Sequence, residues 1–418
     1  MIIERALAER LDAADPLAAF RDRFALGTDD QLIYLDGNSL GRPPKATLER
    51  LRTLFEEEWQ NRLIRGWSTW IELARQAGDV LAGGVVQARP GEVIVSDSTT
   101  VNLYKLAVAA LDARPDRRVI VTDDDNFPTD QYVFAGLAEA RGLEVRKIRT
   151  DIDAGVALAD VVAALDDTVA LVSLSHVAYR SGAIADMAGI TAAAHGAGAL
   201  VLWDLSHSAG SVPVPLTDAG VDLAVGCTYK HLNGGPGAPA FLYVREDLQT
   251  SLRQPIWGWF GQRDQFAMGD DYSPADSIDR FLVGTPPVAG LYGALEGAKL
   301  TSEAGIDAIY AKAQSLTELM IALHDAWLAP LGFTLASPRD AARRGAHVTL
   351  HHQQAWQICQ AWQARGVIPD FRTPERLRIG PAPLYTRHTD VFDAFARLRD
   401  LVAAGEHDGF PAERARVT

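Results

Sequence analysis

Several features that define other classes of protein are missing from this chain. It has only two cysteines, Cys227 and Cys359, in 418 residues, too few for a disulfide framework or a cysteine-based metal site. Its net charge of −14 and sequence pI near 5.2 argue against a surface for nucleic acid or anionic membranes. No apolar run approaches the roughly 20 residues of a membrane helix, and the charged residues within the first five predict no signal peptide. We expect a soluble cytoplasmic protein without a bound metal.

The order of apolar segments predicts an α/β fold. A chain of 418 residues exceeds what one hydrophobic core usually serves, so two domains are expected. Amphipathic helical segments, such as 101–112 and 186–196, alternate with apolar strands, which is typical of a largely parallel sheet covered by helices. The strands are expected at 92–96, 118–122, 143–148, 169–175, 198–204 and 223–229.

The flanking regions add three expectations. Residues 239–244 form a further strand, which must run antiparallel because the loop before it is too short for a crossover helix. Residues 46 to about 82 are expected to be helical, with an interruption near Gly66. From about residue 295, long helical stretches with few strands predict a second, smaller domain.

Lys230 is the first candidate for a chemical role. It follows the apolar run 223–229 and precedes the glycine-rich segment 234–237, so it is expected at the tip of a core strand. A lysine ammonium is costly to remove from water, and desolvation frees its lone pair for Schiff-base chemistry. The alternative is a lysine that merely reaches solvent from a strand end.

Asp204 gives this lysine a partner. It also ends an apolar run, 198–204, and precedes Lys230 by 26 residues, room for one helix and one strand of an α/β sheet. Pyridoxal phosphate requires a lysine for its aldehyde and a carboxylate for its ring nitrogen. Asp204 alone would also serve as a helix N-cap, but together the two residues favour this cofactor.

Further suitable side chains follow other predicted strands at the edge where ligands of open α/β sheets bind. The loop 96–100 enters a helix and either binds a phosphate or supplies an N-cap. Phe127 is placed to stack on a pyridine ring. Thr129 and Asp130 either bond the cofactor or cap the next helix, and His207 either approaches the cofactor or is structural. The edge is formed by Thr99, Thr100, Phe127, Ser175, Asp204 and Lys230.

Three segments outside this edge are also candidates. The cluster at 256–261 and the turn at 284–287 are expected as loops that reach an active site, that of a partner subunit included. Near the end of the chain, Arg376 and Arg378 lie in a strand-like segment. We expect one of the two to point inward, either to bind a substrate carboxylate or, if it lies on an edge strand, to remain solvated.

Taken together, these motifs resemble the kynureninase family, pyridoxal phosphate enzymes of fold type I. The lysine–aspartate pattern is shared by many fold-type I enzymes, whereas LDGNSLG, FPTD and the segment at Arg378 are much more specific. The resemblance runs through LDGNSLG (35–41), TTVNL (99–103), FPTD (127–130), WDLSH (203–207), YKHLNGGPG (229–237) and RIGPAPLY (378–385).

The resemblance implies a role for each matched residue. Lys230 would bind the cofactor covalently, Asp204 would pair with its ring nitrogen, and Tyr229 would relay protons. Arg378, with Asn38 and Ser39, would bind the substrate. Trp259 and Thr285 would reach the site from the second subunit of a homodimer, and Thr285 stands where some relatives carry asparagine. The remaining cofactor contacts would come from Thr99, Thr100, Phe127, Pro128, Thr129, Asp130, Ser175, His207 and Tyr229.

The resemblance also implies the architecture and the reaction. The fold would be a mostly parallel seven-stranded sheet covered by helices, with a smaller α+β domain built from the chain's ends. The division would be an N-terminal segment 1–45, a large cofactor domain 46–294 and a small domain 295–418. The reaction would be hydrolysis of L-kynurenine or its 3-hydroxy form to anthranilate, or 3-hydroxyanthranilate, and L-alanine, in tryptophan degradation or NAD precursor synthesis.

Three rival functions share parts of this pattern. An aminotransferase would use Lys230 and Asp204 equally well. A cysteine desulfurase or selenocysteine lyase would need a reactive cysteine on a mobile loop, whereas Cys359 lies in an amphipathic helical pattern and Cys227 in a strand. A cofactor-binding regulator would normally carry a DNA-binding module, for which the acidic chain shows no spare domain.

Overall fold

The centre of the molecule is a seven-stranded sheet. The computed structural model describes residues 3–414, and the strand order is β2-β8-β7-β6-β5-β3-β4. All neighbours pair in parallel except β8, which is antiparallel to both β7 and β2, as the short preceding loop requires. The strands are β2 (Val93–Val95), β3 (Val119–Asp123), β4 (Glu144–Ile148), β5 (Val169–Ser175), β6 (Leu200–Asp204), β7 (Leu223–Gly226) and β8 (Phe241–Val244).

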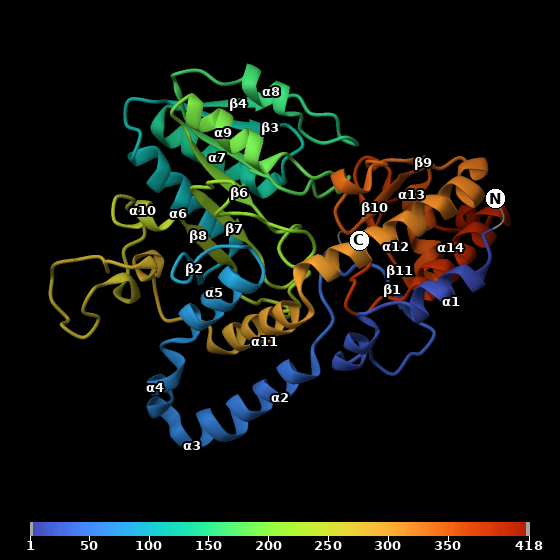
Figure 1. Cartoon of the computed structure of the whole chain (residues 1–418), viewed down its shortest axis with the longest axis horizontal. Coiled ribbons are helices and arrows are strands. Elements are labelled where there is room, and N and C mark those ends of the chain that lie inside the picture. Colours follow the sequence, from blue (N-terminus) through green and yellow to red (C-terminus); the bar gives the residue numbers. More distant parts are fainter. Residues whose placement is uncertain (1–2, 415–418) are drawn as a thin grey trace.

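Helices cover both faces of this sheet (Figure 1). Residues in the inner strands are buried on both faces, which explains their continuous apolar runs. The covering and adjoining helices are α5 (Leu73–Gly84), α6 (Thr99–Asp112), α7 (Pro128–Arg141), α8 (Leu158–Ala163), α9 (Met187–Gly196), α10 (Glu246–Gln249) and α11 (Val288–Ala304). The α/β prediction is therefore confirmed.

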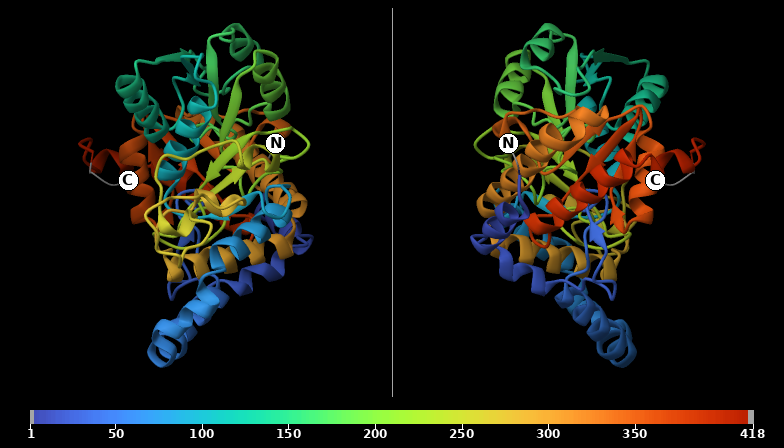
Figure 2. Two further views of the ribbon diagram at one scale, coloured as in Figure 1. Left: turned by 90° about the vertical axis from the view of Figure 1, so that its left-hand side faces the viewer. Right: turned by 90° about the vertical axis from the view of Figure 1, so that its right-hand side faces the viewer.

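Part of the chain before the sheet forms a helical arm. The arm comprises α2 (Lys45–Thr53), α3 (Gln60–Arg62) and α4 (Trp67–Trp70), with a π-helical turn at Leu54–Trp59. It projects from the body in all views (Figures 1 and 2). The helical prediction for 46–82 is confirmed with its interruption, since a 3-10 turn at Leu63–Gly66 precedes α4.

A second group of elements holds its own hydrophobic cluster. Buried residues from α1 pack there with residues from 316 onward. Its helices are α1 (Arg5–Ala13), α12 (Ile306–Leu323), α13 (Ala355–Ala364) and α14 (His388–Ala403); its strands are β1 (Ile33–Tyr34), β9 (Thr334–Leu335), β10 (Val348–His351), β11 (Val367–Ile368), β12 (Asp370–Arg372) and β13 (Arg376–Ile379).

The expectation of few strands after residue 295 is wrong. A four-stranded antiparallel sheet, β12-β13-β10-β9, lies there, and β11 pairs in parallel with β1 from the start of the chain. These strands have two to four residues each, too short for a two-residue periodicity to be visible in the sequence.

Candidate functional site

A cavity of about 630 Å³ opens at the carboxyl ends of the parallel strands. Its walls come from the loops after β2, β3, β5, β6 and β7, because parallel strands bring these loops to one edge. Ser175 and Asp204, the last residues of β5 and β6, are paired in register. The lining residues are Asp97, Ser98, Thr99, Thr100, Phe127, Thr129, Asp130, Ser175, Tyr179, Asp204, Ser206, His207, Tyr229, Lys230, Gly237, Ala238, Pro239, Ala240 and Pro287.

Lys230 lies in this cavity, although not at a strand end. Strand β7 stops at Gly226, so Lys230 sits four residues beyond it. Its Nζ atom lies 3.0 Å from Nε2 of His207 and 5.8 Å from the centre of the Phe127 ring. Because an ammonium can only donate, Nε2 of His207 accepts and the proton of the neutral imidazole is on Nδ1.

His207 is neutral because its surroundings penalise a second positive charge. Burial lowers the pKa of His207 well below its ordinary value, and Lys230 and Arg378 lower it further. Two more buried histidines surround it, with ring centres 6.5 Å away for His231 and 5.6 Å away for His347. Burial also lowers their pKa values. Among residues 3–414, no group of acidic, histidine or cysteine side chains is arranged to hold a metal ion.

Two buried carboxyl groups face the same cavity. Burial raises the pKa of Asp204, while the Ser206 hydrogen bond and Lys230 oppose that rise; Oδ1 of Asp204 accepts from the Ser206 backbone N–H at 2.8 Å. Burial, followed by the Asp204 charge, raises the pKa of Asp130 well above its ordinary value. Oδ2 of Asp130 has no hydrogen-bond partner among the described residues. The site is thus prepared for an added cationic or donor group.

The start of α6 forms another wall. Ser98 is the N-cap, and its hydroxyl accepts from the Val101 N–H at 3.3 Å. The N-cap alternative for loop 96–100 is therefore correct for Ser98, while Thr99 and Thr100 lie in the first turn beside the cavity. First-turn N–H groups and the helix dipole favour an anion there.

Phe127 and Ser175 are held by neighbours on the same edge. The Phe127 ring meets Tyr179 edge-on, with centres 5.2 Å apart and planes at 90°. The Ser175 hydroxyl donates to Oδ1 of Asn126 at 2.8 Å. Tyr179 also lines the cavity, although the sequence motifs do not include it. The signal that points to it is its position in the loop directly after β5.

Six candidate residues do not line the cavity. Trp259 is exposed and begins a 3-10 turn, Thr285 lies in an exposed loop on this chain, and Pro128 begins α7. Arg378 is almost fully buried and contacts the N-terminal segment, where Ser39 Oγ accepts from its Nη2 at 2.7 Å. The list is completed by Asn38 and Ser39, both in the segment 35–41.

The segment 35–41 packs between the lysine loop and strand β13. The Gly41 N–H donates to the Tyr229 carbonyl at 2.9 Å, and the Gly37 N–H donates to the Gly380 carbonyl at 2.9 Å. A Cβ atom on Gly41 would lie 2.4 Å from the Lys230 carbonyl oxygen. A side chain there would displace the lysine loop, which explains the last glycine of LDGNSLG.

The expectation that one of Arg376 and Arg378 points inward is wrong, because both are buried. Residues two apart on a strand share a face, so both arginine side chains point to the same buried side of β13. Arg376 binds Asp153, whereas Arg378 binds Asp370.

The fold is that of fold-type I pyridoxal phosphate enzymes. A cysteine desulfurase from Thermococcus onnurineus has a TM-score of 0.80 at 19% identity, with 92% of this chain and 98% of that chain covered. One from Escherichia coli has a TM-score of 0.79 at 19% identity, over 93% and 98%. At this identity the likeness defines the fold.

Closer relatives define the family. A kynureninase from Pseudomonas fluorescens is 43% identical, with 94% of each chain covered. One from Burkholderia pseudomallei is 44% identical, over 96% of this chain and 95% of its own. Residues 309–398 also match the family model described as the kynureninase C-terminal domain. The chain belongs to the kynureninase family.

Proposed function

We propose that this chain is a pyridoxal phosphate-dependent kynureninase, which hydrolyses the Cβ–Cγ bond of L-kynurenine or 3-hydroxykynurenine to the corresponding anthranilate and L-alanine. The observation that carries the proposal is Lys230 beside Asp204 and His207 in one cavity, in a chain 43% identical to a curated kynureninase over 94% of its length.

The residues of the cavity fit the cofactor. Asp204 supplies a buried carboxylate for a protonated ring nitrogen, which would offset the burial that raises the pKa of Asp204. Thr99, Thr100 and the first turn of α6 would hold the phosphate. Further cofactor contacts would come from Phe127, Pro128, Thr129, Asp130, Ser175, His207 and Tyr229.

The chain's own residues would then handle the protons. When bound, pyridoxal phosphate supplies an electron sink for bonds broken near the substrate α-carbon. Lys230 Nζ is placed to accept the α-proton, and His207 Nε2 orients it at 3.0 Å. Burial raises the pKa of Tyr229, so its hydroxyl stays protonated near neutral pH and can donate. Arg378 would bind the α-carboxylate with Asn38 and Ser39 beside it.

Two observations weigh against cysteine desulfurase chemistry, despite the shared fold. Cys227 and Cys359 are both buried. Burial raises the pKa of both thiols, that of Cys359 to about 12. A thiol that stays protonated and out of reach is a poor nucleophile.

We further propose a homodimer with shared active sites, in the cytoplasm. The support is apolar surface that a partner would cover: Trp59 and Ile64 on the helical arm are 58% and 77% exposed, and Phe266 and Met268 are also exposed. Trp259 and Thr285 would then reach the partner's cavity. In the part of the chain that the structure describes, no helix is long and apolar enough to span a membrane.

We also propose the domain division 1–45, 46–294 and 295–418. Two separate buried clusters support a large and a small unit. Helix α11 crosses the proposed boundary at residue 294 and packs in the cluster of the large unit. The arrangement of these two groups is visible in Figure 1.

The proposed activity has a direct test. Purified protein with pyridoxal phosphate should release fluorescent anthranilate and alanine from L-kynurenine in equal amounts. Transfer of the amino group to a 2-oxo acid without anthranilate would contradict the hydrolase assignment and favour the aminotransferase.

A further inference from the structure

Arg376 and Arg378 provide a matched pair of buried arginines. They are two residues apart on one face of β13, and each binds a carboxylate. Nη2 of Arg376 lies 2.8 Å from Asp153, whose side chain is 42% exposed. Nη2 of Arg378 lies 2.5 Å from Asp370, whose side chain is 1% exposed. Only the second pair is fully buried on both sides.

Asp370 contacts Arg378 because of strand register. Asp370 on β12 stands directly opposite Arg378 on β13 in the antiparallel pairing, and directly opposed residues of opposite charge interact across strands. Because the two residues face each other across the strand pair, the short Asp370 side chain reaches Nη2 of Arg378.

The other donors of Arg378 meet neutral oxygens. Nη1 donates to the Tyr179 carbonyl at 2.8 Å, and Nη2 also donates to the Ser39 hydroxyl at 2.7 Å. The Asn38 amide, oriented so that its nitrogen donates to Asp36, accepts from Nε at 3.1 Å. Asp36 itself lies 3.8 Å from Nη2. The guanidinium is therefore held by one close charged partner and three neutral ones.

An arriving carboxylate would replace the neutral partners. Hydrogen bonds between a guanidinium and a carboxylate are roughly twice as strong as those to neutral oxygens. Tyr179 also lines the cavity, so the edge of Arg378 that its carbonyl occupies adjoins the space a substrate would enter. The Asp370 contact, being charged and buried, is the one that would persist.

We propose that Asp370 is a positioning residue for the substrate carboxylate: it holds Nη2 of the Arg378 guanidinium so that Nη1, which donates to the Tyr179 carbonyl, is presented to the ligand. This inference rests on the proposed function, in which Arg378 binds the substrate α-carboxylate. Asp153 pairs with Arg376 instead, so we do not expect it to position the substrate carboxylate.

The test compares Asp370→Asn with Asp153→Asn, a matched control because Asp153 pairs with the other buried arginine of β13, Arg376. For Asp370→Asn, KM for L-kynurenine should rise at least about tenfold because the guanidinium is no longer fixed, while kcat stays within about threefold. Inhibition by the product L-alanine should weaken far more than inhibition by L-alaninamide, which lacks the carboxylate. Asp153→Asn should leave both properties within about twofold.

Two further measurements keep the outcome clear. Asp370→Glu retains the charge but displaces it by one methylene, so it should fold even where Asp370→Asn does not, and it should also lose preference for alanine over alaninamide. Equal KM values and equal acid-to-amide preference in wild type and both Asp370 variants would overturn the inference. If wild type releases no anthranilate, the proposed function fails first and this inference falls with it.

Discussion

Two lysines near the cavity, Lys105 and Lys230, differ in how completely their ammonium groups are bonded. Lys105 Nζ has a carboxylate, Asp97, at 2.7 Å and the Phe281 carbonyl at 2.7 Å, with Ser96 Oγ at 3.4 Å. Lys230 Nζ has His207 at 3.0 Å. A saturated ammonium is held in place, whereas Lys230 Nζ has fewer partners and can give up a proton to act as a nucleophile or base. Saturation therefore separates the structural lysine from the reactive one.

The largest effect should come from the unsaturated lysine. Lys230→Ala should lower kynurenine turnover by about 10³-fold or more and abolish the visible absorbance of lysine-bound cofactor. The folded state should survive, because Lys230 satisfies few buried groups. Turnover assays, absorption spectra and thermal unfolding measure these three results; turnover close to that of wild type would remove Lys230 from its proposed role.

The saturated lysine should show the opposite pattern. Lys105→Met breaks a buried ion pair and leaves the Phe281 carbonyl without its donor, which should cost about 2–3 kcal/mol of unfolding free energy. Turnover per cofactor-loaded molecule should fall less than tenfold. Denaturant unfolding and titration with cofactor check this. A full loss of turnover in a stable, cofactor-loaded Lys105→Met protein would contradict the assignment of Lys105 as the structural lysine.

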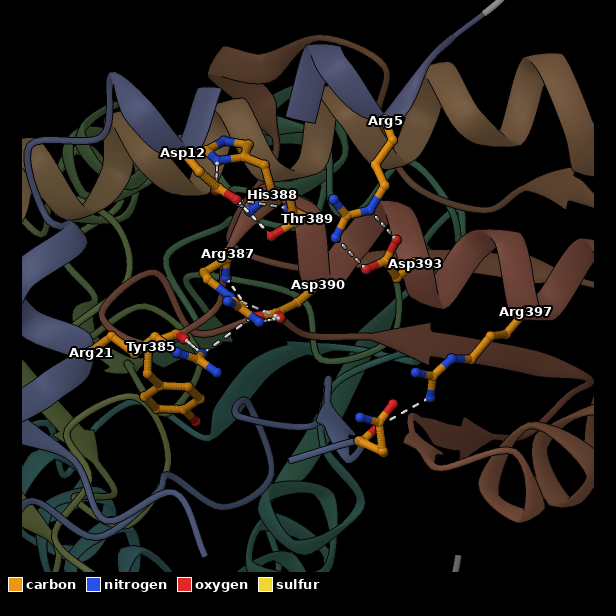
Figure 3. A network of polar contacts seen from close by, with 11 residues as sticks. Arg5, Asp12, Arg21, Tyr385, Arg387, His388, Thr389, Asp390, Asp393 and Arg397 are labelled. Carbon is orange, nitrogen blue, oxygen red and sulfur yellow. Dashed lines mark hydrogen bonds and ion pairs between the residues drawn. The ribbon is translucent and has the colours of Figure 1, made fainter. Parts of the chain in front are cut away.

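Asp12, a carboxylate outside the cavity, is also well supplied with hydrogen-bond partners, so we expect it to be structural like Lys105. Asp12 accepts hydrogen bonds from the backbone and side chains of His388 and Thr389 at the start of α14 (Figure 3). Burial alone would raise the pKa of Asp12, but these bonds hold it below its ordinary value. Asp12→Ala should cost about 2 kcal/mol of stability without changing KM.

The pH dependence of this contribution has a definite sign. Because the folded-state pKa of Asp12 is depressed, its stabilisation is present above the unfolded value of about 4 and is lost as the pH falls below it. The unfolding free energies of wild type and Asp12→Ala should therefore differ by a constant amount above about pH 5 and draw together as the pH falls from about 4 toward the depressed folded-state pKa. A difference that stays constant from pH 5 down to pH 2 would contradict the role of the ionised carboxylate.

The smallest effect is expected at Ser98. Ser98→Ala removes the N-cap of α6, which should cost about 1 kcal/mol. Because Thr99 and Thr100 would remain to hold the phosphate, cofactor affinity should fall less in Ser98→Ala than in Thr99→Ala. The reverse order would make Ser98 the phosphate contact and Thr99 the structural residue.

The sequence predicts one half of the molecule better than the other. Lys230 and Asp204 were identifiable because long apolar runs precede them, and parallel strands bring such run ends to one edge. The apolar runs predict all seven strands of the large sheet, although β7 ends earlier than expected, at Gly226. Beyond residue 295, strands of two to four residues carry no visible period, so the second sheet was missed.

The surroundings of Arg378 could not be predicted for a related reason. Asp370 and Arg378 meet only because β12 and β13 pair in a particular register, and Ser39 reaches them from the other end of the chain. Neither contact leaves a local pattern. Hydrogen-bond saturation, which distinguishes Lys105 from Lys230, likewise depends on packing, since the Phe281 carbonyl reaches Lys105 from 176 residues away.

The position of the segment 35–41 has a consequence for synthesis on the ribosome. This segment contacts the Tyr229 carbonyl through Gly41 and the Gly380 carbonyl through Gly37, so it is fixed by residues that are translated much later than the segment itself. The sheet and its lysine can form while the ribosome is still translating, since their strands are consecutive up to residue 244. The arginine side of the site can be completed only after residue 378 has been made, long after the strands of the large sheet. A nascent chain would therefore acquire its cofactor cradle well before its substrate arginine.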